Sequence, residues 1–474
     1  MPITGGCHMG IYSQIQDQIV YYQSWYKNYC NIMHMPIRHG PVQTVKNLHK
    51  YPWLWQLAKV NRLLDMVTKG RQGNYRKATA AVVEKVVPNL MQLLDNLNTD
   101  TDRLVLHEDM VPPEILFAMG LKTWMSELLG ILLPMVDSHS VEKYIDIAEN
   151  AGIPPDVCSL PKGTMGIILN QEVPPVKAIL TSNSPCDGGM ASYQLIKNKL
   201  DIPMYQLDVP YNFYNERAIN YFANELKEMI VWLETNTPGK MDWDHLRAIC
   251  EERNRMAAYE LELWEAIRQR PAPLAAEAVY LSHLWCFNVT PGDPGGTKLF
   301  KYLVELANDN VQKNIAAVPN EKYRTVLWNP PLLHFIKLFS WAERHYGLTL
   351  IIDSMSYNRQ PFIDTSTQES MLKGLAHIIM TGPMARHTRG PSENYFIDMF
   401  YIYTYFDLDM ILVAGHIGCK NTAALNGILR EKCRKKGIPV LIIDYDLSDP
   451  RVVSHDGIIR QMDRFMENIM KNTH

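Results

Sequence analysis

The chain has 474 residues, which is more than a single hydrophobic core usually organises, so two or three domains are expected. Its formal net charge is only −3, which excludes a broad electrostatic attraction to nucleic acid or to an anionic membrane surface. No apolar run is long enough to span a bilayer, and the first residues lack the pattern of a signal peptide. We therefore expect a cytoplasmic protein that binds neither nucleic acid nor membrane.

The N-terminal part is predicted to be helical. Apolar residues recur at steps of three and four around Leu57 and Leu63, and again around Val82 and Val86. We assign residues 1–100 to a helical extension that packs on a core or on a partner.

From about Arg103 the pattern is typical of an α/β domain. A short strand is expected first, and then a helix from about Pro113, because proline suits the first helical turn. The runs VKAILT and IPMYQLDV are almost continuously apolar, as in strands buried on both faces of a parallel sheet, and the stretch between them has helical periodicity. Residues 101–214 are therefore assigned to a first α/β domain.

Helical patterns return over residues 215–320, which we interpret as an all-helical insert. Strands RTVLWN, LTLIID, MILVAG and VLIIDYD then alternate with helices over residues 321–474. The stretch from Asp409 repeats the order of parts found from Val176: strand, cysteine-bearing loop, helix and second strand. The predicted fold class is α/β, with two doubly wound, flavodoxin-like parallel-sheet domains, a helical insert and a helical N-terminal extension.

Cysteines are the residues with the clearest chemical potential. In the expected compartment they are reduced thiols or metal ligands, and no C-x-x-C pair occurs. Cys186 and Cys419 each follow a strand and precede a helix, at the edge where open parallel sheets bind ligands. A helix N-terminus there favours the thiolate form. Cys158 lies in a proline-rich loop ahead of the strand that leads to Cys186.

Three such thiolates would make a soft-ligand site, for which zinc, copper(I) and an iron–sulfur cluster all stay open. The alternative for any one thiol is burial as a small hydrophobic side chain. We expect that for Cys250 and Cys433, which lie in helical stretches. Three cysteines have no supporting context: Cys7, Cys30 and Cys286.

Several motifs together resemble the 2-hydroxyacyl-CoA dehydratase and benzoyl-CoA reductase family, most closely the larger, α-type dehydratase subunit. They are VPPEILFAMGL (111–121), the Cys158 loop, SPCDGG at Cys186, DIPMYQLDVPYN (201–212), the insert from Arg217, and GCKN with GIPVLIIDYDLSDPR within 418–451. The resemblance covers about Leu104 to the C-terminus and leaves out the N-terminal extension.

The resemblance implies that Cys158, Cys186 and Cys419 hold a [4Fe–4S] cluster with a non-cysteine fourth ligand. It implies an acyl-CoA substrate, a smaller related β-type subunit (or a self-dimer) as partner, and a separate iron–sulfur ATPase as activator. That activator injects a low-potential electron, and the substrate loses water through a ketyl radical. The chain itself has no Walker-type G-x-x-x-x-G-K-[ST] motif.

One segment departs from the family pattern. Where the family often has a tryptophan followed by serines, this chain has Leu106, His107, Glu108 and Asp109. His107 could replace the serine as a proton donor, or the acidic pair could mark a surface loop. Glu127 aligns roughly with a family glutamate near the substrate, and is either an acid/base group or a solvated helix residue.

Two further residues adjoin the Cys419 motif. His416 could donate a hydrogen bond to a cluster sulfur and raise the reduction potential, or it could cap the loop. Lys420 could neutralise the cluster or a CoA phosphate. The departures leave three functions open: a radical dehydratase subunit, a subunit of an ATP-dependent reductase of the benzoyl-CoA or double-cubane type, and an electron-transfer or scaffold subunit without catalysis.

Overall fold

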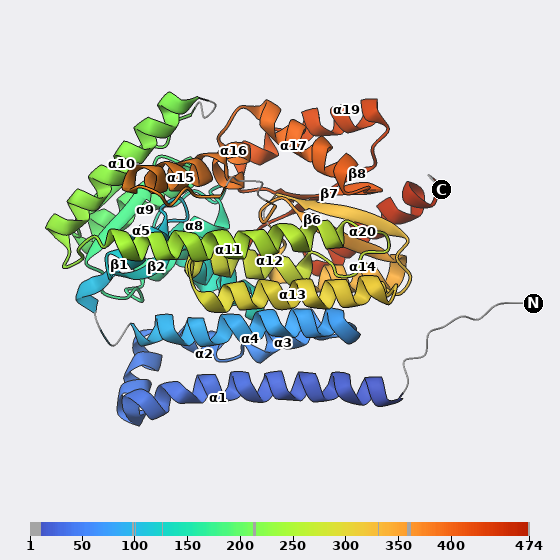
Figure 1. The fold of residues 1–474 in the computed structure, drawn as a ribbon, viewed down its shortest axis with the longest axis horizontal. Coiled ribbons are helices and arrows are strands. Elements are labelled where there is room, and N and C mark those ends of the chain that lie inside the picture. Colours follow the sequence, from blue (N-terminus) through green and yellow to red (C-terminus); the bar gives the residue numbers. More distant parts are fainter. Residues whose placement is uncertain are drawn as a thin grey trace, which may run out of the picture.

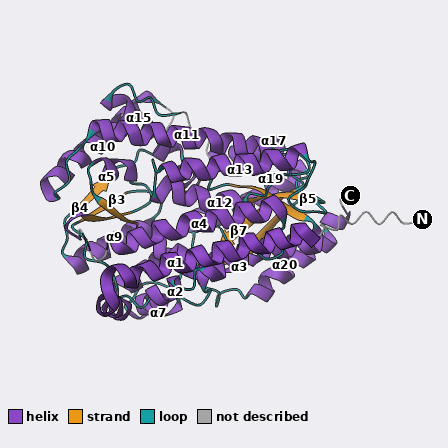
Figure 2. Ribbon diagram, turned by 60° about the horizontal axis from the view of Figure 1, so that its bottom comes forward, coloured by secondary structure: helices purple, strands orange, loops and turns teal. Residues whose placement is uncertain are grey.

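The computed structural model describes residues 11–96, 99, 101–125, 127–211, 215–329, 331–357 and 362–472. Cys7 lies outside the described residues. Two parallel sheets stand at opposite ends of the molecule, with helices around and between them (Figures 1 and 2).

The first sheet has four parallel strands in the order β2-β1-β3-β4. The strands are β1 (Leu104–His107), β2 (Lys122–Met125), β3 (Ala178–Ser182) and β4 (Met204–Leu207). The chain moves outward from β1 to β2 and then returns to place β3 on the other side of β1. The carboxyl ends of β1 and β3 therefore form the switch point, where doubly wound sheets bind ligands.

The second sheet repeats this arrangement with the order β6-β5-β7-β8, again all parallel. Its strands are β5 (Tyr323–Trp328), β6 (Leu348–Asp353), β7 (Met410–His416) and β8 (Val440–Tyr445). The predicted α/β class with two doubly wound sheets is confirmed, and β3 and β7 occupy the same place in their sheets.

Helices complete both α/β units. Those between and after the first strands are α5 (Pro113–Ala118), α6 (Leu128–Val136), α7 (Glu142–Asn150), α8 (Ser159–Leu169) and α9 (Asp187–Leu200). Those of the second unit are α14 (Lys337–Tyr346), α15 (Gln368–Thr381), α16 (Pro383–Thr388), α17 (Ser392–Tyr405), α18 (Lys420–Ala423), α19 (Asn426–Lys436) and α20 (His455–Asn468). Short 3₁₀ turns cover Thr101–Arg103, Leu333–Phe335 and Met470–Asn472.

Helices also make up the segment between the two sheets, as predicted. They are α10 (Glu216–Asn236), α11 (Trp243–Ile267), α12 (Glu277–His283), a π-helical turn (Leu284–Val289) and α13 (Pro294–Gln312). Side-chain caps define where two of them begin: Asn215 accepts a hydrogen bond from the backbone of Ala218, and Asp242 accepts from His245.

The N-terminal extension is helical, as expected. It consists of α1 (Ile11–Lys50), α2 (Leu54–Leu57), α3 (Asn61–Thr68) and α4 (Gly73–Asp95). In Figure 1 these helices form successive layers, with α1 outermost and α3 and α4 between it and α13. Helix α1 bends at Gly40, whose φ of 79° is a conformation that favours glycine.

One continuous hydrophobic core crosses all these parts. The same buried cluster contains Leu64 and Val83 from the extension, Leu106 from the first sheet, Phe300 from the insert and Ile411 from the second sheet. A second cluster covers the other face of the first sheet and includes Val105 of β1, because neighbouring strand residues point to opposite faces.

The same hydrophobic core includes residues on both sides of each expected domain boundary, at 100, 214 and 320. The division into separate domains therefore stays a prediction. In the described part of the chain, no helix is both long and apolar enough to cross a membrane.

Candidate functional site

The three predicted cysteines share one structural position: each is the residue immediately before a helix. Cys158 precedes α8, Cys186 precedes α9 and Cys419 precedes α18. Cys186 follows β3 and Cys419 follows β7, so these two thiols lie at equivalent switch points of the two sheets. All three are half-buried, whereas Cys250, Cys286 and Cys433 are fully buried and Cys30 is exposed.

The structure brings the loops that carry these thiols together. A Cβ atom added to Gly418 would lie only 2.7 Å from the Cα atom of Cys158, so the Cys419 loop passes directly over the start of α8. Asn421 donates to the carbonyl of Pro185, next to Cys186, at 3.3 Å. Residues 158, 186 and 419 therefore meet at one place, although up to 261 positions separate them in sequence.

Polar contacts also fasten the loops across the two α/β units. Lys420 forms an ion pair with Asp156, two residues before Cys158, at 2.6 Å. Arg389, just after α16, donates to the side-chain oxygen of Asn183 at 2.8 Å and also to its carbonyl oxygen. Lys420 thus has an acidic partner within the chain. That it neutralises the cluster or a CoA phosphate stays a prediction.

Electrostatics also indicate that the three sulfurs are near one another. Burial is the main cause that raises the pKa of Cys158 well above its usual value, and negative charge on Cys419 and Cys186 adds to it. Burial likewise raises the pKa of Cys186 to about 11, with a contribution from Cys419. For Cys158 and Cys186, burial therefore outweighs the expected stabilisation of the thiolate by a helix N-terminus.

The arrangement does not suit a single metal ion. Among the described residues, no group of three or more His, Cys, Asp or Glu side chains lies close enough together to hold one ion. In a [4Fe–4S] cluster each cysteine binds a different iron, so the sulfurs are held further apart than around one ion. Three thiols that hold a cluster therefore need not form such a close group.

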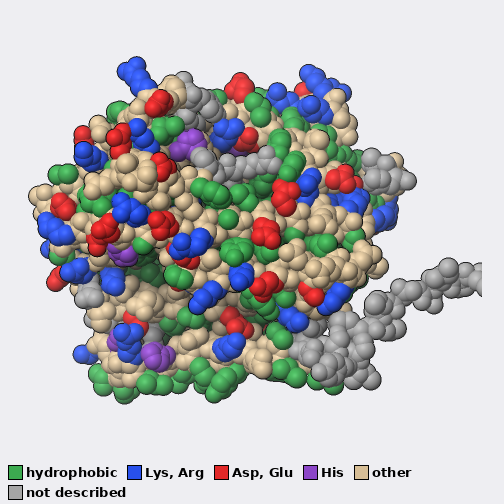
Figure 3. All heavy atoms as spheres, viewed as in Figure 1, with side chains coloured by type: hydrophobic (Ala, Val, Ile, Leu, Met, Phe, Trp, Pro, Cys, Tyr) green, Lys and Arg blue, Asp and Glu red, His purple; other side chains and the backbone are tan. Residues whose placement is uncertain are grey.

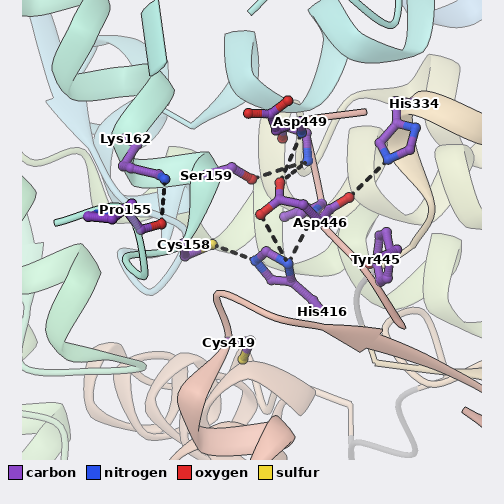
Figure 4. A network of polar contacts seen from close by, with 12 residues as sticks. Pro155, Cys158, Ser159, Lys162, His334, His416, Cys419, Tyr445, Asp446 and Asp449 are labelled. Carbon is purple, nitrogen blue, oxygen red and sulfur yellow. Dashed lines mark hydrogen bonds and ion pairs between the residues drawn. The ribbon is translucent and has the colours of Figure 1, made fainter. Parts of the chain in front are cut away.

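His416, at the end of β7, contacts the first of these thiols. The backbone N–H of Leu447 donates to its Nδ1 at 3.0 Å, so the ring proton of the neutral imidazole is on Nε2. Nε2 lies 3.0 Å from the Sγ atom of Cys158, as Figure 4 shows. Burial lowers the pKa of His416, which keeps the ring neutral. The predicted hydrogen bond to a sulfur is therefore present, and its sulfur is that of Cys158.

The segment that departs from the family pattern is buried, so the expectation of a surface loop is wrong. Glu108 is 3% exposed and accepts hydrogen bonds from Thr181, at 2.9 Å, and from Ser182 of β3. His107 is buried as well, and its Nδ1–H donates to the carbonyl of Glu108 at 2.8 Å. Burial lowers the pKa of His107 to about 4, so its Nε2 is an acceptor near neutral pH.

Two carboxyl groups lie beside the Cys186 loop. Burial, reinforced by the charge of Glu127, raises the pKa of Asp109 to about 7. Asp109 in turn contributes to the raised pKa of Cys186, so these groups are neighbours. Glu127 lies between β2 and α6 and accepts a hydrogen bond from Tyr193 of α9 at 2.8 Å. It is therefore a half-buried, hydrogen-bonded group and not a solvated helix residue.

Sequence reasoning missed an aromatic region on the other side of the thiols. Tyr395 of α17 donates to Asn329 at 3.0 Å, and its raised pKa, due first to burial, has a contribution from Cys419. Its ring packs edge-on against Trp328 at 5.5 Å, and Trp328 in turn contacts His387 at 5.2 Å. No sequence motif signals this group, because its members come from three separate elements.

His387 also lines a cavity of about 400 Å³ between α15, α16 and α17. Within it, Asp398 accepts hydrogen bonds from Arg386 at 3.0 Å and from His387 at 2.8 Å. Burial alone would raise the pKa of Asp398, but these two partners hold it at about 2. The cavity is thus a mixed polar and aromatic space that a chain of rings connects to the Cys419 region.

Comparisons with known proteins show the family to which the chain belongs. Residues 110–469 match the family model described as 2-hydroxyglutaryl-CoA dehydratase, D-component. The chain is 24% identical over 352 residues to the (R)-phenyllactyl-CoA dehydratase alpha subunit of Clostridium sporogenes, covering 68% of this chain and 81% of that one. It is 22% identical over 355 residues to a benzoyl-CoA reductase subunit of Thauera aromatica, covering 68% and 78%.

A shorter match links it to the (R)-2-hydroxyisocaproyl-CoA dehydratase alpha subunit of Clostridioides difficile, with 25% identity over 205 residues, 40% of this chain and 49% of that one. The family match excludes the N-terminal helices and includes all three cysteines. The chain belongs to the 2-hydroxyglutaryl-CoA dehydratase, D-component family, whose named relatives are enzymes that act on acyl-CoA compounds.

Proposed function

We propose that the chain is the iron–sulfur subunit of a 2-hydroxyacyl-CoA dehydratase-type enzyme. The observation that carries the proposal is that the loops of Cys186 and Cys419, at the matching switch points of the two sheets, lie beside each other and beside Cys158 at the start of α8. Family membership supports the same reading.

Cys158, Cys186 and Cys419 are the residues that would hold a [4Fe–4S] cluster, with a group other than cysteine in the fourth position. Such a cluster would supply low-potential electron transfer, and Lewis acidity toward a thioester carbonyl. The Nε2–H group of His416 would lower the electron density on the Cys158 sulfur.

The chain's own acid/base groups would lie on the Cys186 side. Elimination of water removes one proton from the substrate's β-carbon and adds one to the departing hydroxyl group. Burial, with the charge of Glu127 added to it, raises the pKa of Asp109 to about 7, so Asp109 would hold or release a proton near neutral pH beside Glu127, and the pair would suit both transfers. Tyr193 would orient Glu127 through its hydrogen bond of 2.8 Å.

His107 stays a candidate site residue with a changed role. Because its one ring proton is directed to the carbonyl of Glu108 and burial lowers its pKa to about 4, the neutral ring would accept a hydrogen bond at Nε2 and not donate a proton. Its hydrogen bond also holds the backbone that leads to Asp109.

The proposal includes partners by family reasoning. Relatives named as alpha subunits imply a second subunit, which we propose to be a smaller, related β-type chain, or a second copy of this one. An iron–sulfur ATPase would deliver the electron, and an acyl-CoA would be the substrate, in the cytoplasm.

A reductase is the second candidate, because a benzoyl-CoA reductase is represented among the relatives. It would be an ATP-dependent enzyme of the benzoyl-CoA or double-cubane type. A subunit for electron transfer or scaffolding without catalysis is the third. Release of water from a 2-hydroxyacyl-CoA without net electron consumption would single out the dehydratase. Stoichiometric electron consumption would favour the reductase.

The cluster itself is tested by iron and sulfide analysis of anaerobically purified protein. Cys158→Ser, Cys186→Ser and Cys419→Ser should each lose iron, whereas Cys250→Ser, a substitution at a buried thiol of α11, should keep it. Equal iron content in all four variants, or a single zinc ion per chain in the wild type, would contradict the proposal.

A further inference from the structure

Helix α1 presents an apolar stripe to the outside of the molecule. Seven side chains between 40% and 76% exposed follow one another along it: Ile15, Ile19, Tyr22, Tyr26, Tyr29, Met33 and Ile37. We call these seven the outer stripe. Up to Met33 their spacing alternates between four and three residues, which is the seam of a helix that packs against another helix. Figure 3 shows hydrophobic side chains along the lower edge of the molecule, where α1 lies in Figure 1.

The opposite face of α1 is mixed: Val20, Tyr21 and Ile32 pack against the hydrophobic core, and polar side chains lie between them. Ser24 and Asn28 are fully buried against the rest of the chain, where Ser24 donates to Glu84 and Asn28 donates to Asn61 at 3.1 Å. Lys27 forms an ion pair with Glu84 at 2.8 Å. Apolar side chains thus lie on both faces of α1, whereas a surface helix normally has a polar outer face, so we expect the outer stripe to be covered by something else.

The order of residues in the outer stripe is nearly the same in both directions. Tyr26 is its midpoint, Ile15 and Ile37 are equidistant from Tyr26, and so are Ile19 and Met33. Two copies of α1 laid antiparallel would therefore place Ile15 against Ile37, Ile19 against Met33, and Tyr26 against itself. This self-complementarity is what a two-fold symmetric interface requires, and a different partner would not need it.

The size of the outer stripe also fits a pair of chains. Half-exposed side chains of this size offer on the order of 100 Å² each, so seven give about 700 Å² per copy, close to the roughly 800 Å² per partner of a stable interface. The stripe contains no Asp, Glu, Lys or Arg, so two copies meet without like-charge repulsion. A lipid surface is less suitable, because Lys27 and Arg38, the basic residues nearest the stripe, form ion pairs with Glu84 and Asp95 of α4.

We infer that the outer stripe of α1 pairs with the same stripe of a second copy, so that the chain forms a two-fold symmetric dimer through antiparallel α1 helices. This interface lies outside residues 110–469 that match the family, and it leaves both α/β units and their thiols free of the contact. The inference does not depend on the proposed function.

The first test is the mass of the full chain in solution by light scattering. The wild type should have about twice the chain mass of 54.5 kDa, and Tyr26→Glu should have the mass of one chain with unchanged helix content. Val231→Glu is the matched control, since Val231 of α10 is exposed to the same degree but lies away from α1. A monomeric wild type, or a Tyr26→Glu variant that stays dimeric, would overturn the inference.

The second test distinguishes an antiparallel from a parallel pair of α1 helices. Ile19→Lys and Met33→Glu should each weaken the dimer, and the double variant I19K/M33E should bind itself at least tenfold more tightly than either single variant in sedimentation equilibrium. In a parallel pair the double variant would place like charges together and would be the weakest. That order of affinities would overturn the antiparallel arrangement.

A lipid surface or a different subunit bound to the outer stripe would give other results. Co-sedimentation with vesicles of phosphatidylcholine and phosphatidylglycerol that Tyr26→Glu abolishes would show a lipid contact and overturn the dimer. So would a Tyr26-dependent complex with a co-expressed smaller family subunit. The iron content of Tyr26→Glu should equal that of the wild type, which separates this inference from the proposed cluster.

Discussion

His416 and Cys158 come from different α/β units, yet the imidazole Nε2 lies 3.0 Å from the thiol sulfur. The neutral ring carries its proton on Nε2, because Nδ1 accepts a hydrogen bond from the backbone N–H of Leu447. A neutral ring with a fixed N–H stabilises negative charge on the sulfur without adding a formal charge of its own. The end of β7 therefore contributes to both sides of the site, through His416 and through Cys419.

We predict that His416→Phe reduces iron retention or activity by about tenfold or more, as is typical when a hydrogen bond to a ligand is removed. His416→Gln, whose amide donates over a similar distance, should restore part of the loss. Iron analysis and a redox titration followed by electron paramagnetic resonance measure the effect, with the exposed His139→Gln as control. If His416→Phe keeps both iron content and potential, the hydrogen bond has no influence on the site.

Gly418 supplies a second prediction. Gly418→Ala would force a Cβ atom to within 2.7 Å of the Cα atom of Cys158, which is backbone and cannot simply rotate away. We expect the Cys158 and Cys419 loops to separate and iron binding to fall severalfold. Gly427→Ala in α19 is the control, since its added Cβ has no neighbour within 4 Å. Equal iron contents in the two variants would show that the loops tolerate the displacement.

The raised pKa of Asp109 should make the stability of the metal-free protein depend on pH. Its pKa rises to about 7 from 3.8, so the folded state binds the proton more tightly than the unfolded state. The stability from this proton is present at low pH and is lost as pH rises through about 4 to 7. Asp109→Asn removes this loss. The free energy of unfolding of the variant, relative to that of the wild type, should therefore rise by on the order of 2–4 kcal/mol between pH 4 and pH 8. Urea unfolding at pH 5.5 and 8 checks the trend, and a difference that shrinks with rising pH would contradict it.

Glu127 predicts a loss of activity without loss of iron. Glu127→Gln keeps a carbonyl that accepts from Tyr193 but cannot take up a proton, so turnover should fall by about 10² to 10⁴. Tyr193→Phe, which only frees the carboxylate to reorient, should have a smaller effect. Assays of water release beside iron analysis distinguish the two. Full activity in Glu127→Gln would remove Glu127 from the proposed proton transfer.

The strands were predictable wherever the sequence has long apolar runs. Such runs indicated β3 to β8, because strands buried on both faces need uninterrupted apolar residues. The expected burial on both faces is wrong for β4, which lies at the edge of its sheet with Gln206 exposed. Strand β2 escaped prediction, since Lys122–Met125 is four residues long and leads directly into the apolar helix α6. That omission also hid the position of Glu127, which follows the strand.

The candidate site was only partly predictable for a related reason. The repeated strand–loop–helix pattern placed Cys186 and Cys419 after equivalent strands, and β3 and β7 do occupy equivalent places in their sheets. Their meeting with Cys158 depends on contacts between distant loops, such as Gly418 over Cys158, which no local pattern encodes. The burial of Glu108 was not foreseen, because its partners Thr181 and Ser182 are more than 70 residues away.

The N-terminal helices are joined to the rest of the chain by the shared hydrophobic core and by buried ion pairs. Arg71, 3% exposed, pairs with Glu277 of the insert and, at 3.2 Å, with Glu343 of α14, so the extension is fixed by buried charges as well as apolar contacts. A protein trimmed to the family-matched stretch would bare this acidic pair and one side of the hydrophobic interior, and it should precipitate or stay unfolded. The first hundred residues, although outside the stretch that matches the family model, should thus be as necessary to the folded chain as the sheets themselves.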